Sequence, residues 1–303
     1  MYIIQNCNTH YPLALSGRVC SIIHARKNVV KPKYFFFDID GTLVPFGKDM
    51  PESAKSAIRA AQALGNRCFL STGRSSAELP GDVLSVGFDG IVSSAGCRVD
   101  VEGENVFDAY MDPGVYSRTY DYLTEHGLYI LVQKDQGTFM SERTHEMFDS
   151  TLMSHIGRKI HLDCIVHTDE KPSADGVRKL LFLSEEDGWG ASRVKRDLDP
   201  SLFLVRNTVG LPYELMGEIV RGDITKATGI EMVLGHYGAD RSDSVAVGDG
   251  SNDIEMVEWC GLGIAMGNST EDLIEVADWV STDVEDDGLK NAIFYALREE
   301  WKK

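Results

Sequence analysis

The pattern of apolar and polar positions predicts short strands and helices. They alternate regularly in the first and last parts of the chain and follow another order in the middle. Apolar runs that predict strands cover residues 34–37, 67–71 and 90–94. The alanine-rich segment 51–64 predicts a helix, with Pro51 near its start and Gly65 after its end, where helices favour these residues. Strand, helix and strand in close succession indicate a parallel sheet with right-handed connections.

The same alternation returns in the last part of the chain. Strands are predicted at 244–247 and 263–266, and helices at 224–236, 252–259 and 287–301. The segment between the two alternating parts has another order. A hairpin is predicted over 99–111, followed by helices at 113–126, 144–155 and 185–198 and strands at 128–132, 177–183 and 202–205. This order predicts an α/β protein in which a separate α+β module is inserted into a parallel-sheet core.

Two domains are also what a length of 303 residues suggests. We place the core at 33–111 plus 210–303 and the inserted module at 112–209, where prolines mark both ends. Residues 1–32 fall outside this scheme. The first thirty are basic and contain no acid, as in some targeting segments, but they lack a continuous apolar run and a clear cleavage site. We therefore expect a poorly ordered or loosely docked extension of a cytoplasmic protein.

The composition narrows the possible functions. Hydrophobic residues make up 43% of the chain, which suits a globular core, and no apolar run approaches the ~20 residues of a membrane span. The net charge of −17 and the pI near 4.8 argue against a nucleic-acid-binding face. A phosphorylated ligand would be repelled at long range and would need local cations. Six cysteines without CxxC spacing predict reduced thiols: Cys7, Cys20, Cys68, Cys97, Cys164 and Cys260.

Two carboxylates follow the first strand. The aromatic run Tyr34–Phe37 leads into Asp38 and Asp40, and Gly41 and Thr42 are part of the same motif. Burying an unpaired charge is costly, so acids at the end of an apolar strand predict a site at the carboxyl edge of a parallel sheet. Alternate residues of a strand point the same way, so both carboxylates can face one pocket. Asp38 is a candidate nucleophile, and Asp40 is a candidate general acid and base.

Two further motifs carry groups that bind anions. Thr72, with Gly73 beside it, follows a predicted strand and can bind a phosphate oxygen, while Arg74 can hold another anionic or polar part of a substrate. Lys226 stands in the first turn of a predicted helix, where the helix dipole disfavours a cation. A lysine at that position is explained if it reaches the nucleophile and a phosphate.

The fourth motif is again acidic. Asp249, Asn252 and Asp253 follow a predicted strand among glycines, and oxygen ligands of this kind suit Mg²⁺ that shares a substrate phosphate. Each of the four motifs taken alone also fits a structural turn, a helix cap or a solvated lysine. Their joint occurrence at strand ends and a helix start favours one shared site.

Together the four motifs resemble those of the haloacid dehalogenase superfamily of phosphohydrolases. The order of DxDGT, a strand-tip hydroxyl, a helix lysine and GDxxND matches, over roughly residues 33–303. The insert between the second and third motifs is similar to that of the Cof-like subgroup, which has an α/β cap. The resemblance implies a Rossmann-like parallel-sheet core with an inserted α+β cap that selects the substrate.

The resemblance also implies a role for each motif residue. Asp38 would attack phosphorus, and Asp40 would protonate the leaving alcohol and later activate water. The phosphate would be surrounded by Gly41, Thr72, Gly73, Arg74, Lys226 and Asn252, among which Thr72 and Lys226 would be catalytic. The ligands of Mg²⁺ would be Asp38, Asp40 through its backbone carbonyl, Asp249 and Asp253.

The predicted function is Mg²⁺-dependent hydrolysis of a small phosphorylated metabolite, a sugar phosphate or phosphorylated cofactor, through an aspartyl phosphate. The alternatives are a phosphomutase or phosphotransferase on the same scaffold, and a non-catalytic binding protein, against which the intact acids and lysine argue. A nucleotide-binding oxidoreductase would need GxGxxG after the first strand, where this chain has Asp-x-Asp-Gly. No nucleic-acid or membrane partner is expected, and the sequence does not indicate an oligomeric state.

Overall fold

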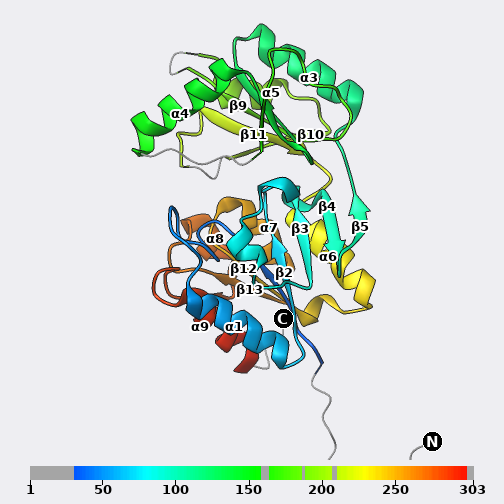
Figure 1. Ribbon diagram of the computed structural model, residues 1–303, viewed down its shortest axis with the longest axis vertical. Coiled ribbons are helices and arrows are strands. Elements are labelled where there is room, and N and C mark those ends of the chain that lie inside the picture. The colour runs from blue at the N-terminus through cyan, green and yellow to red at the C-terminus, as the bar shows by residue number, and fades with distance from the viewer. Residues whose placement is uncertain (1–30, 158–163, 186–187, 207–209, 299–303) are drawn as a thin grey trace, which may run out of the picture. The chain divides into compact units, whose positions relative to one another are not determined.

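The structure is a computed structural model that describes residues 31–157, 164–185, 188–206 and 210–298. The predictions made for residues 1–30 lie outside the described residues. The described chain forms two β-sheets, of eight and six strands, with helices packed on them (Figure 1). Among the described helices, none combines the length and apolar character needed to cross a membrane. The four described cysteines, Cys68, Cys97, Cys164 and Cys260, form no disulfide with one another.

The larger sheet is mostly parallel and has the order β14-β13-β12-β1-β2-β3-β4-β5. Its parallel strands are β1 (Tyr34–Phe37), β2 (Arg67–Ser71), β3 (Gly90–Ser93), β12 (Ser244–Gly248), β13 (Leu262–Ala265) and β14 (Trp279–Val280). An antiparallel hairpin at one edge consists of β4 (Arg98–Val101) and β5 (Glu104–Asp108). Because β1 lies between β2 and β12, the residues that follow these three strands emerge at one edge.

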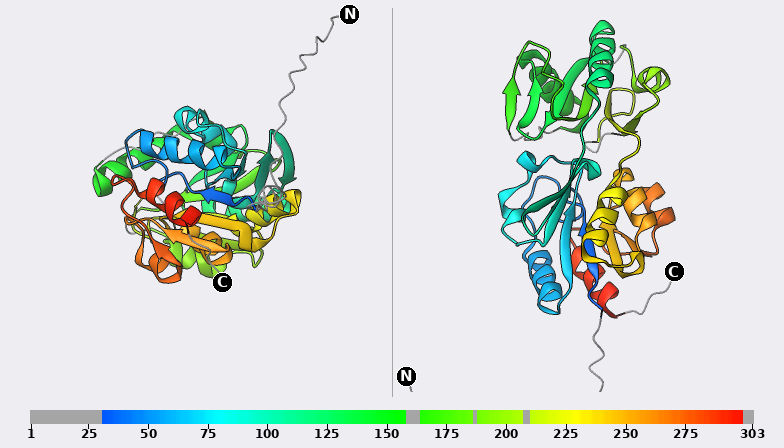
Figure 2. Two further views of the ribbon diagram at one scale, coloured as in Figure 1. Left: turned by 90° about the horizontal axis from the view of Figure 1, so that it is seen from below. Right: turned by 90° about the vertical axis from the view of Figure 1, so that its right-hand side faces the viewer.

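Helices lie on both faces of this sheet (Figure 2). The side chains of β1 alternate between these two faces. Phe35 and Phe37 pack on one face, whereas Tyr34 and Phe36 pack on the other, and all four are buried. The first face carries α1 (Glu52–Ala63), α2 (Gly81–Leu84) and α9 (Gly288–Arg298), and the second carries α6 (Lys226–Tyr237), α7 (Ile254–Trp259) and α8 (Glu271–Val276). The aromatic run therefore places β1, and the acids that follow it, at the centre of the sheet.

The smaller sheet has the order β10-β11-β9-β6-β7-β8. Its strands are β6 (Tyr129–Lys134), β7 (Gly137–Met140), β8 (Ile165–His167), β9 (Val177–Leu183), β10 (Leu202–Arg206) and β11 (Met216–Arg221). Helices α3 (Pro113–Glu125) and α5 (Ala191–Asp197) cover one face, and α4 (Glu142–Ile156) packs on part of the other. We refer to this sheet and its three helices as the cap.

The predicted fold class is confirmed, with differences in the cap. The sequence did not predict β11, because Gly217 and Glu218 interrupt its apolar run. This strand pairs with β9 and β10, so the cap sheet continues past residue 209, where the predicted module ends. The helix predicted at 185–198 is shorter, since α5 begins only after Gly190. The division of the chain into separate domains at the stated limits stays a prediction.

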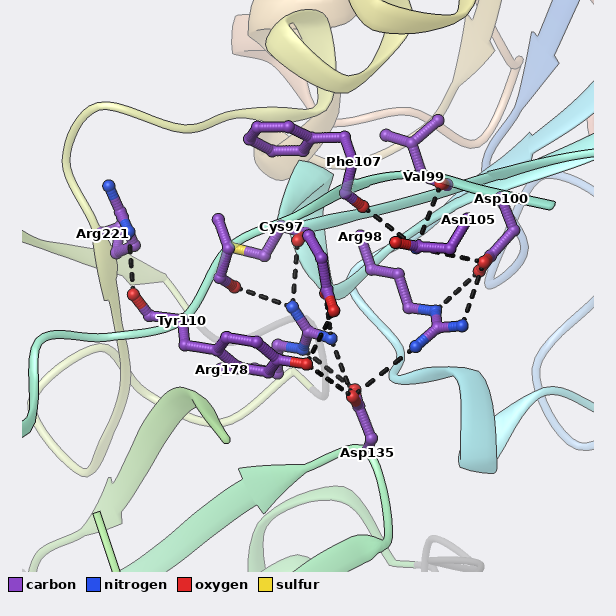
Figure 3. A network of polar contacts seen from close by, with 12 residues as sticks. Cys97, Arg98, Val99, Asp100, Asn105, Phe107, Tyr110, Asp135, Arg178 and Arg221 are labelled. Carbon is purple, nitrogen blue, oxygen red and sulfur yellow. Dashed lines mark hydrogen bonds and ion pairs between the residues drawn. The ribbon is translucent and has the colours of Figure 1, made fainter. Parts of the chain in front are cut away.

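A polar network joins β9 of the cap to the segment that follows β5 (Figure 3). Arg178 of β9 is 0% exposed and donates to the backbone carbonyls of Cys97, at 3.0 Å, and Ala109, at 2.7 Å. Its guanidinium also forms ion pairs with Asp135, at 2.8 Å, and with Asp108. Arg178 thereby ties the cap sheet to the chain segment that leads from the larger sheet into the cap.

Candidate active site

The carboxyl edge of the larger sheet brings four of the predicted site residues together. Because β1 and β12 are parallel neighbours, Asp38 and Asp249 leave the sheet at the same edge. Lys226 is the first residue of α6, and its Nζ lies 2.5 Å from Asp38 Oδ1 and 2.5 Å from Asp253 Oδ1. One ammonium thus bridges carboxylates that are far apart in the sequence.

Lys226 is a buried cation. Its side chain is 1% exposed. Burial by itself lowers the pKa of Lys226, but the carboxylates of Asp253 and Asp38 raise it above its ordinary value. The hydroxyl of Thr225 accepts the Thr228 N–H and caps the start of α6. The lysine in the first helical turn is therefore explained by the carboxylates that it reaches, and not by any contribution to the helix.

The three aspartates outnumber this single cation. One carboxylate oxygen from each of Asp38, Asp249 and Asp253 lies within 4.8 Å of the other two. Burial raises the pKa of Asp38 to about 7, although Lys226 opposes the rise, and burial raises the pKa of Asp249 to about 8. A group of oxygen ligands with excess negative charge fits a hard divalent cation, which would neutralise it. Among the described residues, these three side chains form the acidic group beside which such an ion would fit.

The loop after β12 orients these acids. Asp253 Oδ2 accepts hydrogen bonds from the backbone N–H groups of Asp249, at 3.0 Å, and Gly250, at 3.1 Å, while its Oδ1 binds Lys226. Thr42, to which the sequence assigned no separate role, donates its hydroxyl to Asp249 Oδ1 at 2.8 Å. Both oxygens of Asp253 are engaged with the protein, so this residue holds the lysine and the loop in place.

Asp40 lies at the same edge and has a different partner. Its side chain is 34% exposed, and both of its oxygens accept hydrogen bonds from the guanidinium of Arg74. The distances are 2.8 Å from Nε to Oδ2 and 2.6 Å from Nη2 to Oδ1. The sequence predicted that Arg74 binds the substrate. In the structure its guanidinium lies on a carboxylate of the protein, and substrate binding by Arg74 stays a prediction.

Two predicted phosphate-binding residues occupy the turn after β2. Thr72 is 1% exposed, and its hydroxyl accepts the Arg74 N–H at 3.1 Å. The carbonyl oxygen of Gly73 accepts a hydrogen bond from Nζ of Lys179 in β9, at 3.1 Å. Asn252 lies in the turn after β12, but among the described residues its side chain forms no hydrogen bond with the other predicted site residues. The proposed roles of these residues stay predictions.

The sequence missed Asn268, which supports the turn after β1. Its Nδ2 donates to the carbonyl oxygen of Gly41 at 2.8 Å, and its Oδ1 accepts the Val284 N–H at 2.9 Å. Gly41 has a φ of +86°, and a Cβ there would lie 2.1 Å from Asp249 Oδ2, so the site requires glycine. A signal for Asn268 was available, because it follows β13 after Gly267, as the acids follow β1 and β12.

The fold and the acidic site match a known family. The family model of haloacid dehalogenase-like hydrolases matches residues 35–293. The chain belongs to this family. The resemblance drawn from the four motifs is thereby confirmed, and the chain is a hydrolase with a parallel-sheet core and an inserted cap.

Curated relatives cover most of the chain. A Bacillus subtilis protein named as a phosphatase, YkrA, is 29% identical over 277 residues, which are 88% of this chain and 97% of that protein. The chloroplastic endoribonuclease YBEY of Arabidopsis thaliana is 29% identical over 283 residues, which are 87% of this chain and 47% of that protein. The chain therefore spans about half the length of the Arabidopsis relative.

Solved structures have the same fold. A haloalkanoate-superfamily phosphatase from Bacteroides thetaiotaomicron has a TM-score of 0.75 at 23% identity, over 89% of this chain and 96% of that one. A protein described as a HAD/COF-like hydrolase from Plasmodium vivax has a TM-score of 0.74 at 20% identity, over 88% of this chain and 95% of that one. Both structures share the arrangement of this hydrolase.

Proposed function

We propose that this hydrolase is a Mg²⁺-dependent phosphatase that acts on a small phosphorylated metabolite, a sugar phosphate or a phosphorylated cofactor, through an aspartyl phosphate on Asp38. The observation that carries the proposal is the enclosed group of three aspartates around one lysine at the carboxyl edge of a parallel sheet. Membership of the hydrolase family and the phosphatase name of the relative YkrA support the same activity.

In the first proposed step, a carboxylate oxygen of Asp38 attacks phosphorus while the bond from phosphorus to the ester oxygen breaks. Asp40 gives its proton to the departing oxygen, so that an alcohol leaves and Asp40 becomes a carboxylate. Lys226 offsets the charge on Asp38 and on the phosphoryl group, and the hydroxyl of Thr72 binds a phosphoryl oxygen. Phosphoryl transfer depends mainly on such positioning and charge stabilisation.

In the second proposed step, Asp40 takes a proton from a water molecule as the water oxygen attacks phosphorus. The bond between Asp38 and phosphorus breaks, inorganic phosphate leaves, and both aspartates return to their starting forms. Because the acid of the first step is the base of the second, one carboxyl group serves both half-reactions.

Bound Mg²⁺ would supply charge neutralisation for the acids and for the phosphate. Asp38, Asp249 and the backbone carbonyl of Asp40 would hold the ion. Asp253, also predicted as a ligand, would instead keep Lys226 and the loop in position, because both of its oxygens accept hydrogen bonds from the protein. Asp38 and Asp249 are buried beside too few cations to balance their charges, and burial raises the pKa of both. A bound cation would stabilise their ionised forms, which is the reason to expect an ion at these acids.

The test is release of inorganic phosphate from p-nitrophenyl phosphate and from a panel of metabolite phosphates by the full chain. We expect activity with Mg²⁺, its loss in EDTA and its return with added Mg²⁺. Asp38→Asn should lower the rate by roughly 10³-fold or more while leaving the melting temperature close to that of the wild type. Asp49→Asn, which alters an exposed acid in the loop after β1, is the matched control and should keep full activity.

Several outcomes would contradict parts of the proposal. Full activity of Asp38→Asn would exclude covalent catalysis by this residue, and activity that is indifferent to EDTA would remove the metal. If the phosphoryl group passes to an added acceptor and no inorganic phosphate appears, the protein is a phosphotransferase on the same scaffold.

A further inference from the structure

One short segment of the larger sheet's carboxyl edge contacts both Asp40 and the cap. The segment Thr72–Glu78 follows β2 and begins with the turn that is predicted to bind phosphate. It contains Arg74, whose guanidinium lies on Asp40, and Glu78, whose carboxylate lies against the cap. The same seven residues therefore touch the predicted phosphate position, the predicted acid and base, and the cap.

Three of the five N–H groups of the Arg74 guanidinium donate to the protein. Nε and Nη2 donate to the two oxygens of Asp40, and Nη1 donates to the backbone carbonyl oxygen of Glu78 at 3.0 Å. A bidentate arginine–carboxylate pair fixes the plane of the carboxylate as well as its position. Arg74 could present the edge formed by Nε and Nη2 to a substrate only by leaving Asp40. The geometry therefore favours a role that acts through Asp40.

The carboxylate of Glu78 depends on the cap for its hydrogen bonds. Glu78 is 7% exposed, and its Oε2 accepts from Gln133 Nε2 at 2.6 Å and from the N–H and hydroxyl of Ser75, each at 3.0 Å. Its Oε1 accepts from the hydroxyl of Thr138 at 2.6 Å. Gln133 in β6 and Thr138 in β7 are paired residues of the cap sheet. Removing the cap from this position would take away two of the four donors to this carboxylate.

We propose that Arg74 is a positioning residue for Asp40, and that the cap controls this position through Glu78. The inference rests on the proposed function, in which Asp40 gives its proton to the departing ester oxygen. Each oxygen of Asp40 accepts one N–H from Arg74 and retains a lone pair for the transferred proton. When the cap holds Glu78, the backbone carbonyl that anchors Arg74 is held as well. Proton transfer then occurs only with the cap in place over a bound substrate.

The test compares two esters whose leaving groups need a proton to different degrees. The leaving group of an alkyl phosphate is a strongly basic alkoxide, which needs a proton in order to depart. The leaving group of p-nitrophenyl phosphate is p-nitrophenolate, which departs without a proton. The ratio kcat/KM covers only the steps up to loss of the leaving group, so it isolates this proton transfer. We expect Arg74→Met to lower kcat/KM by ~10²-fold for the alkyl phosphate that the wild type hydrolyses best, and by less than ~3-fold for p-nitrophenyl phosphate.

Three further variants sharpen the result. Arg74→Lys keeps the charge but cannot form two parallel hydrogen bonds, so its loss should show the same dependence on the leaving group. In an Asp40→Asn background, Arg74→Met should add less than ~2-fold for the alkyl ester, because the two residues act as one unit. Arg196→Gln is the matched control: Arg196 forms the same bidentate pair with Asp197 on the exposed surface of α5, and its loss should change neither ester.

The cap's part is tested by Thr138→Val, which removes only the hydroxyl that donates to Glu78. We expect kcat/KM to fall by ~5-fold for the alkyl ester and to stay unchanged for p-nitrophenyl phosphate, with no further loss when Arg74→Met is added. Thr119→Val is the control, because Thr119 is another buried cap threonine, in α3 and away from Glu78.

The outcomes separate the inference from the proposed function. A wild type that releases no phosphate from any ester would overturn the proposed function and this inference with it. An active wild type with equal losses for both esters in Arg74→Met would overturn the inference alone, and would identify Arg74 as a ligand of the phosphate. If Thr138→Val leaves the ratio of kcat/KM for the two esters unchanged, the inference that the cap acts on Asp40 through Glu78 is overturned.

Discussion

Lys226 at the candidate site and Arg178 at the junction with the cap are both buried cations that bridge two aspartates, but the aspartates differ in exposure. The side chains of Asp38 and Asp253 around Lys226 are 6% and 0% exposed. Those of Asp108 and Asp135 around Arg178 are 31% and 23% exposed. Water therefore screens the charges beside Arg178, whereas the charges beside Lys226 are enclosed.

The remaining partners of the two cations differ as well. Arg178 also donates to two backbone carbonyls and stacks over the ring of Tyr110, with 3.9 Å from its Cζ to the ring centroid (Figure 3). Asp249 lies beside the Lys226 pair and adds a third buried acid. The contrast teaches that burial of charge alone does not indicate chemistry. An enclosed excess of negative charge does, because it calls for a further ion, whereas a partly solvated ion-pair cluster such as that of Arg178 holds structure together.

The largest expected effect concerns the junction. Arg178→Met should lower the free energy of unfolding by about 3 kcal/mol, because it removes a buried guanidinium that donates to two backbone carbonyls and pairs with two aspartates. The measurement is the urea unfolding midpoint at pH 7.5. Arg118→Met, which removes an exposed pair with Asp199, should cost less than about 0.5 kcal/mol. If Arg178→Met lowers the free energy of unfolding by less than about 1 kcal/mol, Arg178 does not stabilise the junction, and the contrast with Lys226 fails.

The next effect concerns the geometry of the enclosed acids. Gly41→Ala should lower kcat/KM by about 10²-fold, because its Cβ would displace the carboxylate of Asp249. Gly65→Ala is the matched control: its φ of +89° imposes a similar backbone strain, but nothing lies within 4 Å of the added Cβ. Both variants should lose similar stability in thermal unfolding, and only the first should lose activity. Equal activities would mean that the position of Asp249 does not matter.

The smallest effect is a pH dependence of stabilisation by Mg²⁺. The pKa of Asp38, about 7, and that of Asp249, about 8, are raised above their ordinary value of 3.8, so without a divalent ion the free energy of unfolding falls as pH rises from about 4 to about 8. An ion bound to the ionised acids offsets this loss. Mg²⁺ at tens of Kd should therefore add about 2 kcal/mol at pH 8.5 and much less at pH 5.5.

The pH experiment is a thermal unfolding series with and without Mg²⁺ at each pH. Asp249→Asn should remove most of the Mg²⁺ effect at pH 8.5, whereas the exposed-acid control Asp49→Asn should retain it. A stabilisation of the same size at both pH values would show that the enclosed acids do not bind the ion. The acids around Lys226 would then have a structural role, as those around Arg178 do.

The sequence was sufficient for the features that depend on local pattern. The aromatic run of β1 and the apolar run of β12 predict strands of one parallel sheet, and acids that follow such strands emerge at its carboxyl edge. That geometry places Asp38 and Asp249 at the same edge without knowledge of any side-chain conformation, whereas the direct pairing of β1 with β12 came from the structure. Lys226 was found for a similar reason, since a cation at the start of a helix is unfavourable unless an anion lies within reach.

The tertiary structure decided what long-range pairing controls. The partner of Arg74 is Asp40, 34 positions away, and the donors to Glu78 come from residues 55 and 60 positions away. β11 is a strand because β9 and β10 offer it edges to pair with, although its own letters interrupt the apolar pattern. Periodicity determines which face of an element is buried, but the contact between two particular polar side chains depends on how the sheets are packed together. For this reason the sequence indicated a phosphoryl-transfer site, whereas only the tertiary structure showed which residues contact Asp40, Lys226 and the cap.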